Sequence, residues 1–128
     1  MNVRTDPYNL WTYEGALEEE VTKSKSIKIE LARGDLTAKD MDIIVNLFEV
    51  PPGATVAKHT HLGEEIVYVI DGGTLREPDG TLVTFEAGSA LIYARGVPHA
   101  GVTVVGDKPL KMLNVFIVDK GKPVTELV

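Results

Sequence analysis

The sequence contains no cysteine and only three histidines among its 128 residues. Without cysteine the chain can form no disulfide and no thiolate metal site, and a cysteine nucleophile is excluded. Its apolar runs are only as long as single strands, far short of a membrane-spanning helix. Basic residues are also in the minority, with 13 Lys and Arg against 19 Asp and Glu and a formal net charge of −6. Such a chain repels a phosphate backbone, so we expect no nucleic-acid partner, and the short apolar runs predict no membrane partner.

The N-terminal residues lack the apolar core of a secretory signal, because Arg4, Asp6 and Asn9 follow Met1 closely. On this ground we expect a cytoplasmic protein, while a signal peptide that had been removed would leave no trace. Hydrophobic residues make up 44% of the chain, enough for a packed core, and 128 residues fit one domain.

Glycine and proline are plentiful, at 12 and 7 residues, and they divide the chain into short segments. From Ser26 onward these segments have the alternating pattern or the β-branched content of strands. The expected strands are residues 27–32, 42–50, 55–61, 65–70, 81–85, 90–93, 100–105 and 110–118. Tight turns between them, such as Asp79-Gly80, indicate an antiparallel sandwich or barrel with almost no helix.

The pattern divides this single domain into three parts. Residues 1–25 are expected to form an N-terminal arm that packs on the barrel or on a partner, with residues 14–23 in a short helix or an irregular segment. Its apolar contact residues would include Trp11 and Tyr13. Residues 26–119 form the barrel, and residues 120–128 form a C-terminal tail.

The histidines mark the candidate site. His59 and His61 are two residues apart on an expected strand, so both side chains lie on one face. Glu65 begins the next strand, whose alternation turns Glu64 to the opposite side, and His99 follows a glycine-proline turn and leads into another strand. Imidazoles and a carboxylate that converge form a ligand set for a divalent transition metal with open positions. We therefore predict a metal site made of His59, His61, Glu65 and His99.

Residues 53–72 have a specific spacing: glycine, five residues, His-x-His, three residues, Glu, six residues and glycine. This segment resembles the first motif of the cupin superfamily at every fixed position. Residues 88–103 resemble the second motif through Gly88, Gly96 and His99. Ala94 and Thr103 stand where that motif usually has proline and asparagine, but neither is a metal ligand.

The resemblance is to small, single-domain, metal-binding cupins of the bacterial type. It implies an all-β fold, a cupin jelly-roll β-barrel, with one divalent transition metal per chain inside it. Iron or manganese is favoured, with zinc, nickel, cobalt or copper as alternatives. The resemblance also implies a homodimer, across which the N-terminal arm could lie.

A cupin fold alone does not define an activity, because the superfamily includes dioxygenases, decarboxylases, isomerases, lyases and sugar-binding proteins. We predict a metal-dependent cupin that acts on a small, partly hydrophobic molecule bearing oxygen, with dioxygenase chemistry as the leading version. A Lewis-acid lyase, isomerase or decarboxylase is the alternative within enzymes. A non-catalytic, metal-dependent binder of a small ligand is the alternative outside them.

Acid–base groups are scarce in this interpretation, because all three histidines are metal ligands. Proton transfer then falls to metal-bound water, to Glu65, or to a tyrosine or carboxylate at the barrel mouth. The candidate catalytic residues are Glu65 and Tyr93.

Four further residues are candidates for substrate binding. Asn46 and Asn114 are amides within apolar strands, so they lie on the outer face or line the cavity and bind a ligand or water. Phe48 is an aromatic residue of the same strand as Asn46 and more often belongs to a core than to a substrate site. Arg95 flanks the second motif and could receive an anionic substrate, a solvated loop charge being the alternative.

Overall fold

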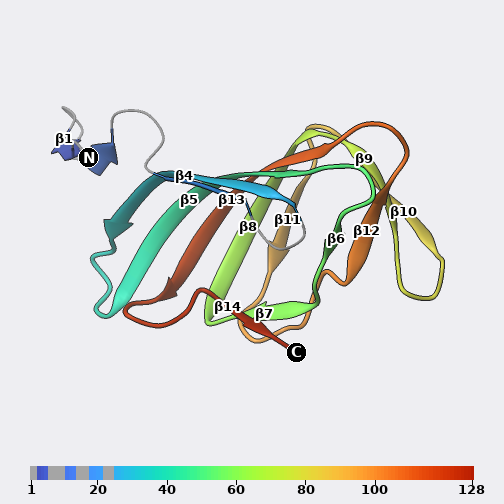
Figure 1. Ribbon diagram of the computed structural model, residues 1–128. Coiled ribbons are helices and arrows are strands. Elements are labelled where there is room, and N and C mark those ends of the chain that lie inside the picture. The colour runs from blue at the N-terminus through green and yellow to red at the C-terminus, as the bar shows by residue number, and fades with distance from the viewer. Residues whose placement is uncertain (1–2, 6–10, 14–17, 22–24) are drawn as a thin grey trace.

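The structure, a computed structural model, describes residues 3–5, 11–13, 18–21 and 25–128, with side chains from residue 25 onward. These residues form strands and turns, and they contain no helix. Every strand pairing is antiparallel, as the tight turns predict. The strands form a six-stranded and a four-stranded sheet, which lie beside each other in Figure 1, with the pair β7 and β14 at one end. The all-β expectation is confirmed.

The six-stranded sheet runs in the order β11-β8-β13-β5-β4-β3. Its strands are β3 (Glu18–Val21), β4 (Ile27–Asp35), β5 (Met41–Val50), β8 (Gly63–Asp71), β11 (Ala90–Tyr93) and β13 (Leu110–Asp119). The two longest strands, β5 and β13, pair along their whole length, from Leu110 opposite Val50 to Asp119 opposite Met41. β3 corrects one expectation, because residues 18–21 form an edge strand paired with β4 and no part of a helix.

The four-stranded sheet runs in the order β10-β9-β12-β6. Its strands are β6 (Thr55–Val56), β9 (Gly73–Arg76), β10 (Leu82–Phe85) and β12 (Val102–Val105). The two remaining pairs join β1 (Val3–Thr5) to β2 (Trp11–Tyr13) and β7 (His59–His61) to β14 (Thr125–Leu127). The sequence did not predict β9 or β14, and the single strand expected over residues 55–61 is divided into β6 and β7.

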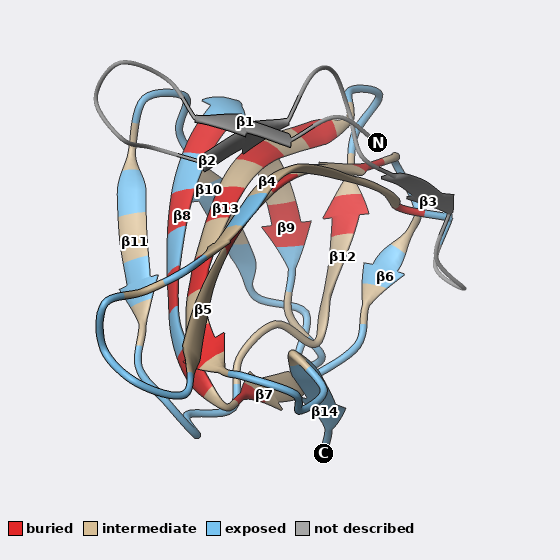
Figure 2. Ribbon diagram, turned by 90° about the vertical axis from the view of Figure 1, so that its left-hand side faces the viewer, coloured by how far each residue is buried: buried red, intermediate tan, exposed pale blue. Residues whose placement is uncertain are grey.

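The core lies between the two large sheets. On β13 the inward side chains are all buried and the intervening ones are only half-buried, the alternation of a strand with one face on the core. Figure 2 shows the buried positions as red bands on β5, β8, β13, β9 and β12. One apolar cluster draws on both sheets and consists of Val50, Val67, Val69, Leu75, Val104, Leu110 and Met112.

Gly63 fixes where β8 begins against β13. A Cβ at this position would lie 1.9 Å from the carbonyl oxygen of Ile117, so only glycine allows the strands to approach this closely. The contact sets the pairing of Gly63 with Val118 and, two residues on, of Glu65 with Phe116. The register of β8 therefore directs Glu65 into the barrel.

The N-terminal arm is described only in part. The backbones of residues 11–13 and 3–5 pair as strands, but the side chains of Trp11 and Tyr13 lie outside the described residues. Their expected packing on the barrel or on a partner therefore stays a prediction. Among the described residues, no helix is long and apolar enough to cross a membrane.

Candidate metal centre

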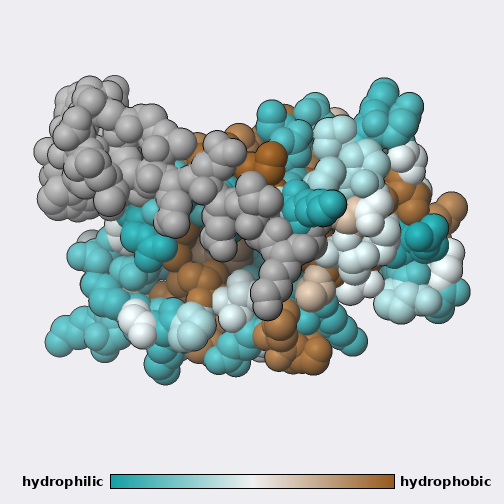
Figure 3. Space-filling model, in the orientation of Figure 1, coloured by the Kyte–Doolittle hydropathy of each residue, from teal (hydrophilic) through white to brown (hydrophobic). Residues whose placement is uncertain are grey.

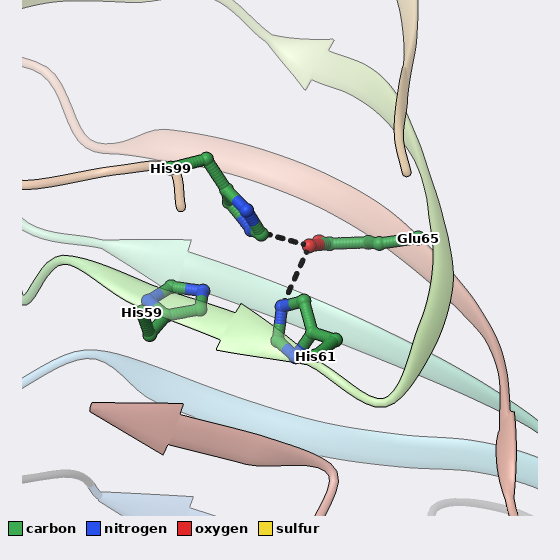
Figure 4. A group of neighbouring side chains, drawn as sticks. All are labelled: His59, His61, Glu65 and His99. Carbon is green, nitrogen blue, oxygen red and sulfur yellow. Dashed lines mark hydrogen bonds and ion pairs between the residues drawn. The ribbon is translucent and has the colours of Figure 1, made fainter. Parts of the chain in front are cut away.

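Three segments bring the four predicted ligands together. His59 and His61 project from the same face of β7, Glu65 from β8, and His99 from the loop between β11 and β12 (Figure 4). His59 and His99 are held side by side by two backbone hydrogen bonds of 3.0 and 2.9 Å, each from the N–H of one to the carbonyl of the other. One ligand atom from each of the four residues lies within 4.8 Å of every other.

Each imidazole is oriented through its Nδ1 atom. The acceptors are backbone carbonyls: Ala57 O at 2.6 Å from His59, Val124 O at 2.8 Å from His61 and Val97 O at 3.0 Å from His99. Because a carbonyl can only accept, each Nδ1 carries the proton and donates it. In all three rings the other nitrogen, Nε2, is then left with the lone pair that a metal would bind. Such hydrogen bonds fix the tautomer and the orientation of metal-binding histidines.

The carboxylate of Glu65 meets two of these nitrogens through one oxygen. Its Oε1 lies 3.0 Å from Nε2 of His61 and 3.1 Å from Nε2 of His99. Nε2 of His61 is fully buried and, despite this contact, makes no hydrogen bond of acceptable geometry. Neutral rings would direct lone pairs at an anionic oxygen, so a proton or a cation is needed between them.

The two contacts of Glu65 have the spacing of ligands on one divalent transition metal. Nitrogen and oxygen ligands about 2.1 Å from a metal are held about 3.0 to 3.4 Å from one another in octahedral or tetrahedral sites. The His61 and His99 contacts to Glu65 fall in this range, at 3.0 and 3.1 Å. Three imidazoles and one carboxylate are also a donor set that suits such a metal. The residues present therefore fit the metal that the fold family implies.

The electrostatics of the cluster keep Glu65 ionised. Burial alone would raise the pKa of Glu65, but contacts with His61, His99 and Asn114 outweigh it and hold the pKa at about 2. Burial would lower the pKa of His99, yet its hydrogen bond to Glu65 raises it overall. For His59 burial prevails and the pKa is lowered, which favours the neutral ring that a metal requires.

The two adjacent glutamates face opposite sides of β8. Glu65, Val67 and Val69 are buried, while Glu64 and the other alternate residues of the strand are exposed. Strand alternation predicted this division, because side chains two residues apart share a face. Glu64 therefore lies on the outer surface, away from the cluster.

The two amide candidates both lie inside the barrel. Asn46 on β5 and Asn114 on β13 are register partners, and each is 6% exposed. Asn114 Nδ2 donates to Oε2 of Glu65 at 2.5 Å, whereas Asn114 Oδ1 is buried without a hydrogen-bond partner. Of the two locations that the sequence left open, both amides thus occupy the cavity wall and not the outer face, and their binding of a ligand or water stays a prediction.

A cavity of about 730 Å³ adjoins the cluster and includes all four predicted ligands in its wall. This volume is in the range of small-molecule sites, which are mainly apolar with a few placed polar groups. Much of the remaining wall is apolar and includes Phe48, Val56, Val67, Leu75, Met112 and Phe116. A small, partly hydrophobic ligand would fit this lining.

The other candidates divide between the cavity and the surface. Phe48 and Tyr93 line the cavity, and the Tyr93 ring stacks on His99 with centroids 4.1 Å apart and planes 8° apart. Arg95 instead makes two hydrogen bonds to Asp119, at 2.9 and 3.0 Å, and does not belong to the described cavity wall. The structure thus brings Tyr93 to the cluster and pairs Arg95 outside it.

Sequence reasoning missed the contribution of the tail. Val124 supplies the carbonyl that orients His61, and Thr125 pairs with His61 in the β7–β14 ladder. No motif predicts that contact, since the partners are 63 residues apart. The only signal was the valine and threonine content of residues 124–128, which is compatible with a strand.

Comparison with protein families agrees with the motifs. Residues 46–116, more than half of the chain, match the family described as the cupin domain. The chain belongs to this family. The match confirms the expected superfamily and, together with the two facing antiparallel sheets, the expected jelly-roll fold.

Solved structures show the same fold in proteins of different function. The polyketide cyclase RemF from Streptomyces resistomycificus has a TM-score of 0.63 and 24% identity, covering 87% of this chain and 79% of that one. A structure of the DMSP lyases RdDddP and RnDddQII has a TM-score of 0.61 and 23% identity, covering 81% and 53%. The complex of Rhodobacter sphaeroides SigE with the anti-sigma ChrR has a TM-score of 0.59 and 20% identity, covering 77% and 49%. Among curated proteins no match is found.

Proposed function

We propose that the protein is a metal-dependent cupin enzyme that holds one divalent transition metal through His59, His61, Glu65 and His99. The observation that carries the proposal is the convergence of three Nδ1-anchored imidazoles on a buried carboxylate beside a largely apolar cavity. Iron or manganese is the favoured metal, because imidazole with carboxylate and open positions suits redox-active metals. Zinc, nickel, cobalt and copper are the alternatives.

The substrate in this proposal is a small, partly hydrophobic molecule that bears oxygen. The apolar side chains of the cavity wall would bind its hydrophobic part and exclude water from the reacting end. The bound metal would supply an electrophilic centre and, with iron, a site for dioxygen. The protein would hold the three Nε2 atoms in place and keep Glu65 ionised, and dioxygenase chemistry is the leading version.

A second candidate is a Lewis-acid lyase, isomerase or decarboxylase. The observation that favours it is the phenol of Tyr93, which lies in the cavity wall with its ring stacked on His99. A hydroxyl at this position could exchange a proton with a substrate held at the metal. The similar folds of a polyketide cyclase and of DMSP lyases support keeping this candidate.

The deciding experiment combines metal analysis with a substrate screen. Protein purified without a histidine tag is stripped with a chelator, reloaded with single metals and screened with and without oxygen. Activity that returns with one metal and requires oxygen supports the dioxygenase, and activity without oxygen supports the Lewis-acid candidate. Ligand binding without turnover would instead favour a metal-dependent binder, and turnover by the stripped protein would contradict the proposal.

We also propose that two copies pair through the outer face of β8 and β11. Ile66 lies opposite Ile92 and Tyr68 opposite Ala90 on this face, and Ile92 is 74% exposed. β11 is the edge strand of its sheet, so a twofold-related copy would cover the same apolar patch on both partners. Light scattering should find a dimer that Ile92→Asp dissociates, while Leu82→Asp on the other sheet has no effect. A monomeric wild-type protein would contradict this pairing.

A further inference from the structure

The two oxygens of the Glu65 carboxylate have separate partners. Oε1 faces the Nε2 atoms of His61 and His99, at 3.0 and 3.1 Å. Oε2 accepts the hydrogen bond from Asn114 Nδ2. A carboxylate held in this way offers one oxygen to the centre of the cluster, while the other is occupied by a donor from the neighbouring strand.

We infer that Asn114 is a positioning residue that keeps Glu65 a one-oxygen ligand and thereby keeps a coordination position free for substrate. The inference rests on the proposed metal site. A metal can bind a carboxylate through one oxygen or through both. With one oxygen, the four residues supply four donor atoms and leave about two positions of an octahedron open. With both oxygens, Glu65 would fill one of those positions itself.

The surroundings of Asn114 point to this role more than to packing. It lies in β13 between Met112 and Phe116, both buried and apolar. Its Nδ2 is bonded to Glu65, but its Oδ1 is buried and has no partner, so the amide is only half satisfied. An apolar side chain of the same size would avoid that deficiency. What asparagine provides here is the N–H that occupies Oε2.

Asn46 provides a matched control. It is the register partner of Asn114, has the same 6% exposure and also lines the cavity. No hydrogen bond of its side chain occurs among the described residues, so it does not orient Glu65. A change at Asn46 alters the polarity of the cavity to a similar degree and leaves the carboxylate as it is.

The test uses cobalt-loaded protein and azide as a small probe of the open positions. Wild type should take up about one Co²⁺ per chain and bind azide. Asn114→Leu should retain cobalt but bind azide at least about tenfold more weakly, in line with other residues that orient metal ligands. Its visible cobalt spectrum should also differ from that of wild type, because the second oxygen of Glu65 would replace an exchangeable ligand of the metal. Asn46→Leu should match wild type within about twofold in both measurements.

Each outcome bears on a different statement. If wild-type protein takes up no cobalt, the proposed metal site is wrong. If it takes up cobalt but binds no azide, or if Asn114→Leu behaves like wild type, the role assigned to Asn114 is wrong. An equal loss in Asn46→Leu also overturns it, because the effect is then general to the cavity. Should the leucine variant not fold, Asn114→Thr is measured instead, since its hydroxyl is one bond too short to occupy Oε2 in the same way.

Discussion

Two layers of the barrel interior differ sharply in chemistry although three strands, β5, β8 and β13, contribute to both. The polar layer consists of Asn46, His61, Glu65 and Asn114, and the apolar layer consists of Val50, Val69, Leu75, Val104 and Leu110. On β5, β8 and β13 the two layers lie four residues apart on the same inward face, which is about 13 Å along a strand. On these three strands, the position along the strand determines whether an inward side chain is polar or apolar.

The apolar layer is fully buried and has no polar side-chain atom to satisfy. The polar layer is buried almost as deeply, yet it contains two atoms without a hydrogen-bond partner, His61 Nε2 and Asn114 Oδ1. Unpartnered buried groups reduce stability, so the polar layer costs free energy that the apolar layer offsets. The comparison indicates that the apolar layer stabilises the fold, while the polar layer holds the residues of the proposed metal site.

The largest effect is expected from a substitution in the ligand cluster to which the polar layer belongs. His99→Ala removes one of the three imidazoles and should weaken metal binding at least about 100-fold, more than the loss of a residue that only supports a ligand. Competition with a chelator of known affinity measures the change. Val104→Ala, in the apolar layer, should retain the metal. If His99→Ala kept full affinity, the site would be elsewhere.

The next largest effect is expected from a substitution in the apolar layer. Leu110→Ala removes a side chain that is 2% exposed and should lower the free energy of unfolding by about 2–5 kcal/mol, as other buried leucines do. Urea unfolding of metal-free protein measures the loss. Metal stoichiometry of the folded variant should stay unchanged, and a combined loss of metal and stability would contradict the separation of the layers.

Acid should weaken the metal-free protein through Glu65. Its pKa in the folded protein is about 2, below the ordinary value of 4.5. A lowered pKa stabilises the folded state above pH 4.5, and that contribution disappears as the pH falls from about 4.5 to about 2. The difference corresponds to about 3 kcal/mol.

Urea unfolding of the metal-free protein at several pH values in this window tests the prediction. Glu65→Gln cannot ionise, so it should remove the part of the pH dependence that Glu65 causes. A wild-type curve that stays flat between pH 5 and 2 would be incompatible with an ionised Glu65 in the folded state.

The smallest effect is expected at Glu64, which lies next to Glu65 on β8 and faces outward. Glu64→Gln should change metal affinity by less than about twofold, because that side chain is exposed and points away from the barrel interior. Glu65→Gln should weaken binding about 10- to 100-fold in the same assay. Equal effects would mean that β8 has a different register from the one described.

Much of the fold follows from local patterns. Alternation predicts most of the strands, and two-residue spacing places Glu65 with Val67 and Val69 on the inner face. The spacing of His59, His61, Glu65 and His99 also predicts which residues cluster, a cluster that the structure forms. These features could be predicted because each depends on residues close in the chain or on a short motif.

What could not be predicted depends on contacts between distant residues. Asn114 bonds to Glu65 across 49 residues of sequence, and Arg95 pairs with Asp119 across 24. Alternation alone does not say which face of β13 is inward, because both faces carry apolar residues. The outward face includes Leu113, Val115 and Ile117. The choice becomes clear only when the register between β5, β8 and β13 is known.

The pairing of β14 with β7 has a consequence for how the protein could be monitored. Nδ1 of His61 donates to Val124 O, and Val128 N–H donates to Lys58 O, so residues 124–128 brace the strand that carries two of the proposed metal ligands. The coupling free energy between two sites is the same in both directions. If the docked segment 124–128 increases the affinity for a cation, the bound cation must stabilise the docked segment by the same free energy. Hydrogen exchange or proteolysis at these few residues would then report the occupancy of a centre buried inside the barrel.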